Sequence, residues 1–71
     1  MSNGGRMILM ALNDMKSSLN EDLLFKEGKT YIAYHQSSIS GHRWYVMVSE
    51  RDNKTYIKEN GRFHRNMVEI E

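Results

Sequence analysis

Apolar residues along the chain form short runs that are separated by polar residues and glycines. Five such runs occupy residues 7–12, 29–35, 43–49, 55–58 and 67–70. Runs of this length, rich in β-branched and aromatic side chains, are typical of β-strands. The pattern therefore predicts an all-β fold of five short strands rather than a helix bundle.

Turn-forming residues lie between these runs. Gly28 can adopt a positive φ before the second strand, and the pairs Asn-Gly at 60–61 and Asp-Asn at 52–53 favour tight turns. The serine-rich residues 37–41 predict a loop, and residues 63–66 predict one turn of 3-10 helix. Short strands with turns between them, about ten residues apart, indicate a small closed or half-closed barrel.

The run at residues 43–49 is the clearest strand. Its five central residues, from Trp44 to Val48, are all apolar, so both faces of the strand are apolar. A strand with two apolar faces is covered on both sides or lies at the centre of its sheet.

Two segments admit alternatives. Residues 13–24 predict an irregular loop, because Asn and Ser side chains compete with regular structure, and a short helix is the second interpretation. In the run at 29–35, Thr30, Ile32 and Tyr34 share one face and the residues between them share the other. A period of two does not decide which face is buried. The expected core comprises Ala11, Leu23, Phe25, Ile32, Val46, Val48, Ile57, Val68 and Ile70.

A chain of 71 residues with 39% hydrophobic residues and no cysteine has room for one small domain. We expect residues 1–6 to be a flexible leader or the remnant of a tag, and residues 7–71 to form the domain. The longest apolar run is too short to span a membrane, and no secretion signal precedes it. These features predict a cytoplasmic protein with no membrane partner.

Four segments carry a family resemblance, in order along the chain: ALNDM at 11–15, EDLLFKEG at 21–28, RWY at 43–45 and GRFHRNMV at 61–68. They resemble the landmarks of Src-homology-3 (SH3) domains, namely the Ala-Leu-Tyr-Asp-Tyr opening, an acidic loop before Leu-x-Phe-x-x-Gly, a Trp-Trp pair and a closing Pro-Ser-Asn-Tyr-Val. The resemblance implies a five-stranded SH3-like barrel. In loop lengths the chain is more similar to small SH3-like proteins of bacteria and their phages.

The positions that bind ligand in that family are mostly altered here. The resemblance places the family's proline-binding grooves at Asn13, Met15, Trp44, His64 and Met67. Only the tryptophan is retained, and a polyproline ligand stacks on flat aromatic rings. The sequence therefore argues against recognition of proline-rich PxxP peptides.

Binding to another protein is nevertheless the function that the pattern favours. A barrel this small cannot bury all its aromatic residues, and tryptophan often anchors small interfaces. We expect a small adaptor or inhibitor, including a phage-encoded one, that docks on a larger host protein. The residues expected to contact this partner are Trp44, Tyr45, Met15, His64 and Met67, with Arg43 and Arg62 at the rim.

Nucleic acid is the alternative partner. Residues 54–65 are basic and contain interleaved aromatic side chains. In proteins that bind single-stranded nucleic acid, the cations bind phosphates and the aromatic rings stack on bases. The candidate contacts are Lys54, Tyr56, Lys58, Arg62 and Arg65. A solvated, lysine-protected strand edge explains the same charges without a ligand.

Catalytic and metal chemistry receive no support from the sequence. The serines at 37, 38 and 40 lie near His35 and His42, but no third residue is placed to orient a base. The three histidines lack the spacing of a metal site, and no cysteine is present to complete one. The sequence thus predicts a protein that is not an enzyme and needs no cofactor.

Overall fold

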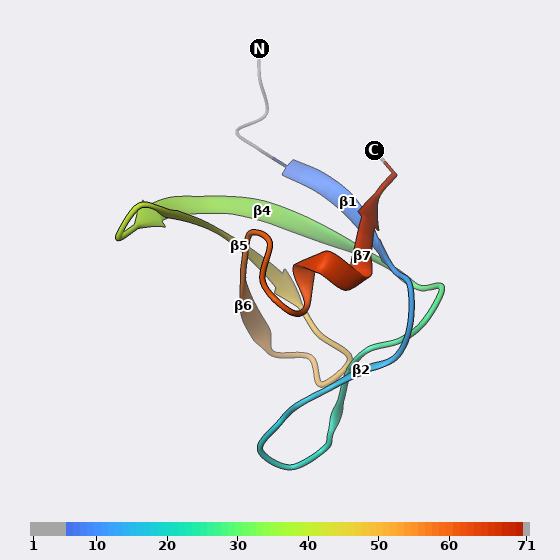
Figure 1. Ribbon diagram of the computed structural model, residues 1–71. Helices are drawn as coiled ribbons and strands as arrows, with labels where there is room; N and C mark the ends of the chain where they lie inside the picture. Colours follow the sequence, from blue (N-terminus) through green and yellow to red (C-terminus); the bar gives the residue numbers. More distant parts are fainter. Residues whose placement is uncertain (1–5, 71) are drawn as a thin grey trace.

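The computed structural model describes residues 6–70, apart from the side chains at positions 37 and 39. Five antiparallel strands form one sheet in the order β6-β5-β4-β1-β7, and β2 and β3 form a separate two-stranded hairpin (Figure 1). The elements are β1 (Arg6–Ala11), β2 (Met15–Lys16), β3 (Leu23–Phe25), β4 (Thr30–Ile39), β5 (His42–Val48), β6 (Lys54–Lys58), the 3-10 helix η1 (His64–Asn66) and β7 (Met67–Glu69).

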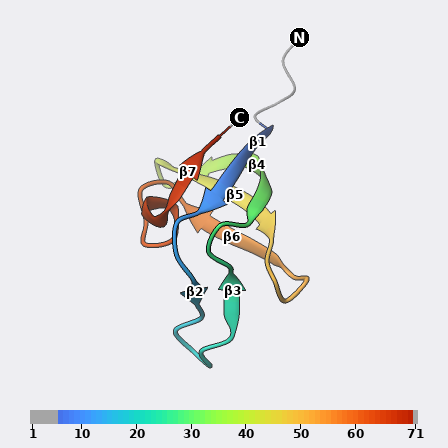
Figure 2. The same ribbon diagram turned by 90° about the vertical axis from the view of Figure 1, so that its right-hand side faces the viewer.

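The β2–β3 hairpin connects β1 to β4 and projects from the end of the sheet (Figure 2). At the base of the hairpin, the Gly28 backbone N–H donates to the Ala11 carbonyl at 2.8 Å. On β3, the Leu24 carbonyl accepts the Glu50 N–H at 2.8 Å, which joins the hairpin to the turn after β5. The φ of Gly28 is +81°, a left-handed conformation that favours glycine. The hairpin therefore packs as part of the domain.

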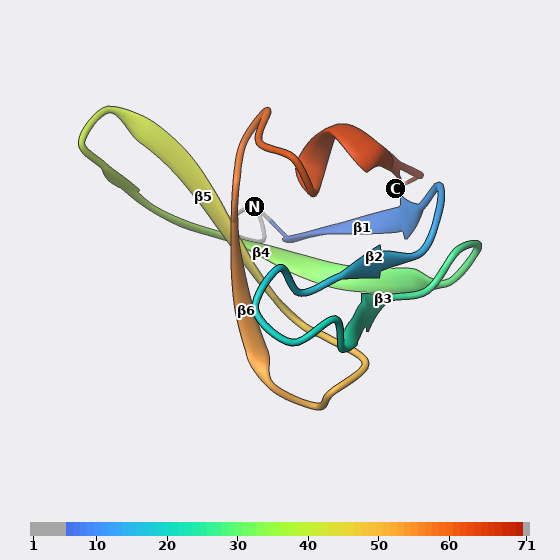
Figure 3. The ribbon, with the colours of Figure 1, turned by 60° about the horizontal axis from the view of Figure 1, so that its bottom comes forward.

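Strand β4 is long and changes partners at Tyr34. Tyr34 lies opposite Arg6 of β1 and opposite Val46 of β5. Before Tyr34 the strand pairs with β1, and after it the strand pairs with β5. One strand shared in this way makes the sheet curl around its core (Figure 3).

The curled sheet stays open, which corrects the expectation of a barrel. Strands β6 and β7 are its two edges, and no ladder joins them within residues 6–70. The chain between them forms tight turns and η1 rather than a further strand. The molecule is all-β, as the sequence predicts, and η1 confirms the expected 3-10 turn.

The core lies on the inner, concave side of the sheet. Phe25 is its centre, with no exposed surface, and its ring meets Tyr31 edge-on at 5.0 Å and Phe63 at 6.0 Å between ring centroids. The sheet contributes alternate residues from each strand, and the hairpin contributes Met15 and Phe25. The buried apolar residues are Leu9, Ala11, Met15, Phe25, Tyr31, Ala33, Tyr45, Met47, Ile57 and Met67.

The expected core was wrong for three of the strands. Ala11, Phe25 and Ile57 are buried as expected. Leu23 and Val46 are only half-buried. Four others are exposed by 40% or more of their surface: Ile32, Val48, Val68 and Ile70.

The reason is that β4 and β5 are apolar on both faces, so their sequence allows either face to turn inward. Tyr31 and Tyr45 occupy the inner face of these strands, where their hydroxyls find carboxylate partners at its margin. The Tyr31 hydroxyl bonds Glu50 and the backbone N–H of Lys26, at 2.6 and 2.8 Å. The rings can then be buried without leaving a polar group unsatisfied.

Other boundaries also differ from expectation. Strand β4 continues to Ile39, so the loop expected at residues 37–41 is reduced to a turn at Ser40 and Gly41, both with positive φ. Residues 13–24 form β2, a turn and the start of β3, so the helical alternative is wrong and the loop contains a hairpin. The leader expected at 1–6 lies outside the described residues, except that Arg6 begins β1.

Candidate interaction surface

The side of the sheet that faces away from the core is apolar across all five strands. Tyr45 and Met47 are in the core, so Trp44, Val46 and Val48 project from the opposite side of β5. We call this side the outer face. Its apolar members are Ile8, Met10, Ile32, Tyr34, Trp44, Val46, Val48, Tyr56 and Val68.

One row of side chains crosses four strands of the outer face. Arg6 lies opposite Tyr34, Tyr34 opposite Val46, and Val46 opposite Tyr56. Tyr34 and Tyr56 are 50% and 52% exposed. Because adjacent strands are about 4.8 Å apart, the two tyrosines stand roughly 10 Å apart, with Val46 between them. The row is an open aromatic platform with an arginine at one end.

Trp44 lies in the next row of the outer face. It is half-buried, and its cross-strand neighbours are Gln36 on β4 and Lys58 on β6. Its indole nitrogen is buried and has no hydrogen-bond partner within the part of the chain that the structure describes. As the only tryptophan in the sequence, Trp44 reports directly on this face.

The charged residues at the strand positions of the outer face are all cationic. Arg6, Lys54 and Lys58 occupy exposed strand positions that share this face, and no acidic residue occupies such a position in the described strands. The outer face therefore combines an apolar centre with a cationic margin. Cations around apolar groups favour a ligand that is apolar and negatively charged.

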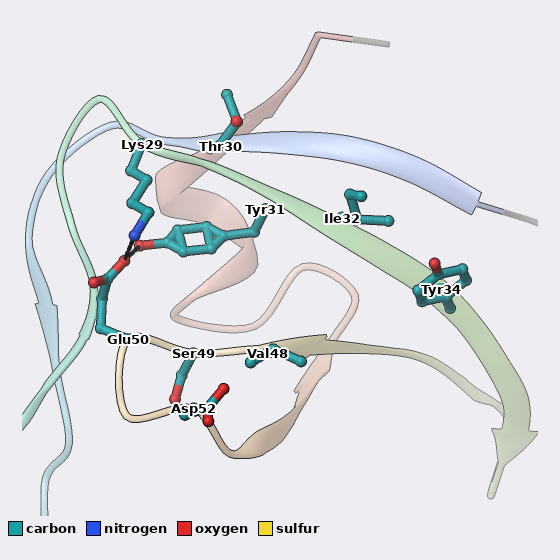
Figure 4. Close-up of a pocket in the computed structure, with 9 residues that line it drawn as sticks. All are labelled: Lys29, Thr30, Tyr31, Ile32, Tyr34, Val48, Ser49, Glu50 and Asp52. Carbon is teal, nitrogen blue, oxygen red and sulfur yellow. Dashed lines mark hydrogen bonds and ion pairs between the residues drawn. The ribbon is translucent and has the colours of Figure 1, made fainter.

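A cleft opens on this side where β4 and β5 separate. Its volume is about 600 Å³, and its apolar walls come from Ile32 and Tyr34 of β4 and Val48 of β5 (Figure 4). A smaller hollow of about 230 Å³ shares these three residues and is lined also by Lys54. The two hollows give the apolar centre of the outer face a concave part.

Polar residues close one end of the cleft, where Lys29, Tyr31 and Glu50 converge (Figure 4). Glu50 Oε2 accepts the Tyr31 hydroxyl at 2.6 Å and pairs with Lys29 Nζ at 2.8 Å. Burial and the bond to Glu50 raise the pKa of Tyr31 to about 12. The bonds from Lys29 and Tyr31 lower the pKa of the Glu50 carboxyl. The three groups satisfy one another and stabilise this end of the cleft.

The structure separates the residues that the sequence placed at one docking site. Met15, Tyr45 and Met67 are 5%, 3% and 9% exposed, so these side chains fill the core and are not available to a partner. His64 stacks on the inner side of Tyr45, with 5.5 Å between ring centroids. Trp44 projects from the other side of β5, so it does not share a surface with His64.

The two predicted arginines lie away from the outer face. Arg43 is exposed next to Trp44 but alternates to the opposite side of β5. Arg62 lies over the Phe63 ring, 4.5 Å from its centroid, and donates to the Lys16 carbonyl at 3.3 Å. Neither arginine forms a rim around Trp44.

The segments at 11–15 and 61–68 lie against each other. The Asn13 amide donates to the Asn66 side chain at 3.2 Å, and the Leu12 backbone N–H donates to the Asn66 carbonyl at 2.8 Å. Asn13, Met15 and Arg62 line a hollow of about 210 Å³ at this junction. The hollow is small and mostly polar, and it presents no pair of aromatic rings for a proline-rich ligand.

The basic strip proposed for nucleic acid divides into two parts. Lys54, Tyr56 and Lys58 alternate along β6 and are exposed on the outer face. Arg62 is engaged with Lys16 and Phe63, and Arg65 lies in η1. Only the β6 part belongs to a continuous surface.

The outer-face residues Ile32, Tyr34 and Val48 were not predicted as contacts. Two of them, Ile32 and Val48, were assigned to the core because they are aliphatic. The sequence contained one indication of this face. Lys54 and Lys58 alternate with Tyr56, so they lie on the same side of β6 and mark that side as exposed and cationic.

Within residues 6–70, no helix is long and apolar enough to cross a membrane, and no three metal-ligating side chains are grouped. Searches against protein-family models, curated proteins and solved structures find no match to this chain.

Proposed function

We propose that the protein is a non-catalytic module that binds another protein through the outer face of its sheet. The observation that supports this proposal is the row Tyr34–Val46–Tyr56, in which two half-exposed tyrosines flank a valine on adjoining strands. Large exposed apolar groups on one face of a small domain are typical of interaction sites. Tyrosine is also enriched at protein interfaces.

The proposal includes an SH3-like architecture. Two observations support it: the β2–β3 hairpin contains most of the segment at 21–28 that resembles the family's acidic loop, and η1 lies within the segment at 61–68 that resembles the closing motif. The binding site differs from the family's proline groove, because Met15 and Met67 are buried at the corresponding positions. We therefore assign partner binding to the outer face.

A capture experiment with two matched variants tests this function. The immobilised wild type, the double variant Tyr34→Ser/Tyr56→Ser and the control Arg43→Ser/Arg65→Ser are compared in lysate of the native host. We expect a protein that the wild type and the control retain and that the tyrosine variant loses. Equal retention by the tyrosine variant and the wild type, with both folded by circular dichroism, would contradict the assignment.

Single-stranded nucleic acid is a second candidate, which the alternation of Lys54, Tyr56 and Lys58 on exposed β6 favours. Titration of Trp44 fluorescence with oligothymidylate tests it. A nucleic-acid function predicts quenching that weakens steeply as salt is raised. The absence of quenching at low salt would exclude it.

A further inference from the structure

We propose that the outer face binds a short, extended, acidic segment of its partner, with apolar side chains in the cleft between β4 and β5 and carboxylates beside Lys54, Lys58 and Arg6. This inference rests on the proposed function and specifies the chemistry of the partner. It follows from three properties of the outer face: its exposed apolar groups, the sign of its charges and the shape of the cleft.

The apolar part of the segment is specified by the walls of the cleft. Ile32, Tyr34 and Val48 remain 43%, 50% and 53% exposed, although they line a concave site of about 600 Å³. Aliphatic and aromatic side chains inserted there would remove the walls from water. A site of this volume accommodates a few large side chains rather than a whole domain.

The charge of the segment is specified by the cations at the strand positions of the outer face. Lys54 lines the smaller hollow together with Ile32 and Val48, and Lys58 lies opposite Trp44. Arg6 ends the tyrosine row. With no acidic residue at the outer-face positions of the described strands, these cations attract carboxylates on the partner.

The same observations disfavour two other occupants. A second copy docked by the same face would bring a second set of Lys54, Lys58 and Arg6 toward the first, and like charges across an interface oppose association. A nucleic acid would satisfy the cations and the tyrosines, but phosphates and sugars would leave the aliphatic walls at Ile32 and Val48 without apolar contacts.

The direction of the segment follows from the two ends of the cleft. Glu50 holds Lys29 and Tyr31 at one end, and Asp52 also lines that end, so a carboxylate of the partner is repelled there. The opposite end leads past Tyr34 (Figure 4), which lies opposite Arg6 of β1. Lys54 lies opposite Val48 near the closed end, whereas Lys58 lies two rows further along β6, opposite Trp44. We therefore expect the carboxylates to lie mainly beside Lys58 and Arg6 and the apolar residues to lie against Ile32 and Val48.

Two synthetic peptides that differ at three positions, Asp in one and Lys in the other, test this inference. The acidic probe is acetyl-GSDLDFDLSG-amide and the basic probe is acetyl-GSKLKFKLSG-amide. Trp44 fluorescence gives the affinity, and backbone amide NMR shifts give the location. We expect the acidic probe to bind at least tenfold more tightly, with the largest shifts at Ile32, Tyr34, Val48 and Lys54.

Charge reversal at two pairs of sites provides the control. Lys54→Glu/Lys58→Glu changes the outer face, whereas Arg43→Glu/Arg65→Glu changes the net charge equally at exposed positions elsewhere. The first variant should bind the basic probe in preference to the acidic one. The second should keep the preference of the wild type. An equal effect of both variants would mean that net charge alone attracts the probe, which would overturn the inference.

The remaining outcomes are also decisive. Equal binding of both probes, shifts confined to the junction of Asn13 with Asn66, or no binding of either probe at millimolar concentration would overturn the inference. So would tighter binding of oligothymidylate than of the acidic probe, or sedimentation that shows a dimer lost in Lys54→Glu/Lys58→Glu. If the acidic-segment inference fails but capture in lysate still depends on Tyr34 and Tyr56, the proposed protein-binding function stands. If capture does not depend on these tyrosines, the proposed function fails as well.

Discussion

The hydroxyl of Tyr31 donates a hydrogen bond of 2.6 Å to Glu50 Oε2 and so joins the start of β4 to the turn that follows β5. Lys29 pairs with the same carboxylate oxygen at 2.8 Å. The two strands diverge here to form the cleft, and these side chains connect its two sides at the closed end. Because Tyr31 ionises at alkaline pH and Glu50 is protonated at acid pH, we expect these bonds to make the stability of the domain depend on pH at both ends of the scale.

At alkaline pH the domain should lose stability as Tyr31 ionises. Its pKa is raised to about 12, above the ordinary value of 10.0, so the folded state disfavours the phenolate. A raised pKa stabilises the fold below pH 10 and the contribution is lost as the pH rises from 10 toward 12. Tyrosinate absorbance near 295 nm should show one tyrosine that titrates late.

The variant Tyr31→Phe is the control for this titration. It should abolish the late phase and lower the free energy of unfolding at neutral pH by about 1 kcal/mol, because it removes a hydrogen bond to a carboxylate and one from the Lys26 N–H. A late phase that persists in Tyr31→Phe would contradict the assignment.

At acid pH the relevant group is Glu50. Its pKa is lowered from the ordinary 4.5 by the bonds from Lys29 and Tyr31, so its stabilising contribution is present above pH 4.5 and is lost as the pH falls through the folded-state pKa. Urea unfolding of the wild type and of Glu50→Gln at pH 6 and pH 3 measures this. The stability difference between the two proteins should be larger at pH 6, and a difference that is equal at both pH values would show that Glu50 does not act through its charge.

The assignment of inner and outer faces predicts opposite results for adjacent residues of β5. Met47 is 2% exposed and Val48 is 53% exposed. Met47→Ala should lower the free energy of unfolding by about 2–5 kcal/mol, since it leaves a cavity, whereas Val48→Ala should cost less than about 1 kcal/mol. Chemical denaturation of the two variants decides the matter. The reverse order would mean that β5 turns its other face inward.

The turn at Gly28 supplies another stability prediction. Its φ of +81° is strained for a residue with a Cβ, although no atom lies within 4 Å of a Cβ built there. Gly28→Ala should therefore destabilise the domain by about 1 kcal/mol through backbone strain alone. Gly28→Asn should cost less, because asparagine tolerates left-handed φ better than alanine does. Equal costs measured by thermal unfolding would indicate a cause other than φ.

The sequence predicts the strands well because each is a compact apolar run bounded by turn residues. Gly28 and the pair at 60–61 locate turns that the structure confirms. The sequence does not predict which side of β4 and β5 is buried, because Ile32 on one side of β4 and Tyr31 on the other are both compatible with a core. The choice depends on long-range partners, such as Glu50 for the Tyr31 hydroxyl.

The candidate site was harder to predict for the same reason. Trp44 was expected to act with Tyr45 and Met67. Tyr45 follows Trp44 on the same strand, so it points to the opposite side, and both Tyr45 and Met67 fill the core. Of the five residues grouped in the basic strip, only Lys54, Tyr56 and Lys58 lie on one side of a strand, because they are spaced by two along β6. What the sequence lacked was the register that sets Tyr56 opposite Val46, and Val46 opposite Tyr34.

Photo-crosslinking from single positions tests the central claim most directly. A benzoylphenylalanine is placed at Tyr34, at Tyr56 or at the exposed Arg65 of η1, and each protein is irradiated in lysate of the native host. We predict one shared partner that is crosslinked from Tyr34 and from Tyr56 and is absent from Arg65. A partner that is crosslinked from Arg65 while neither tyrosine position yields a product would contradict binding through the outer face.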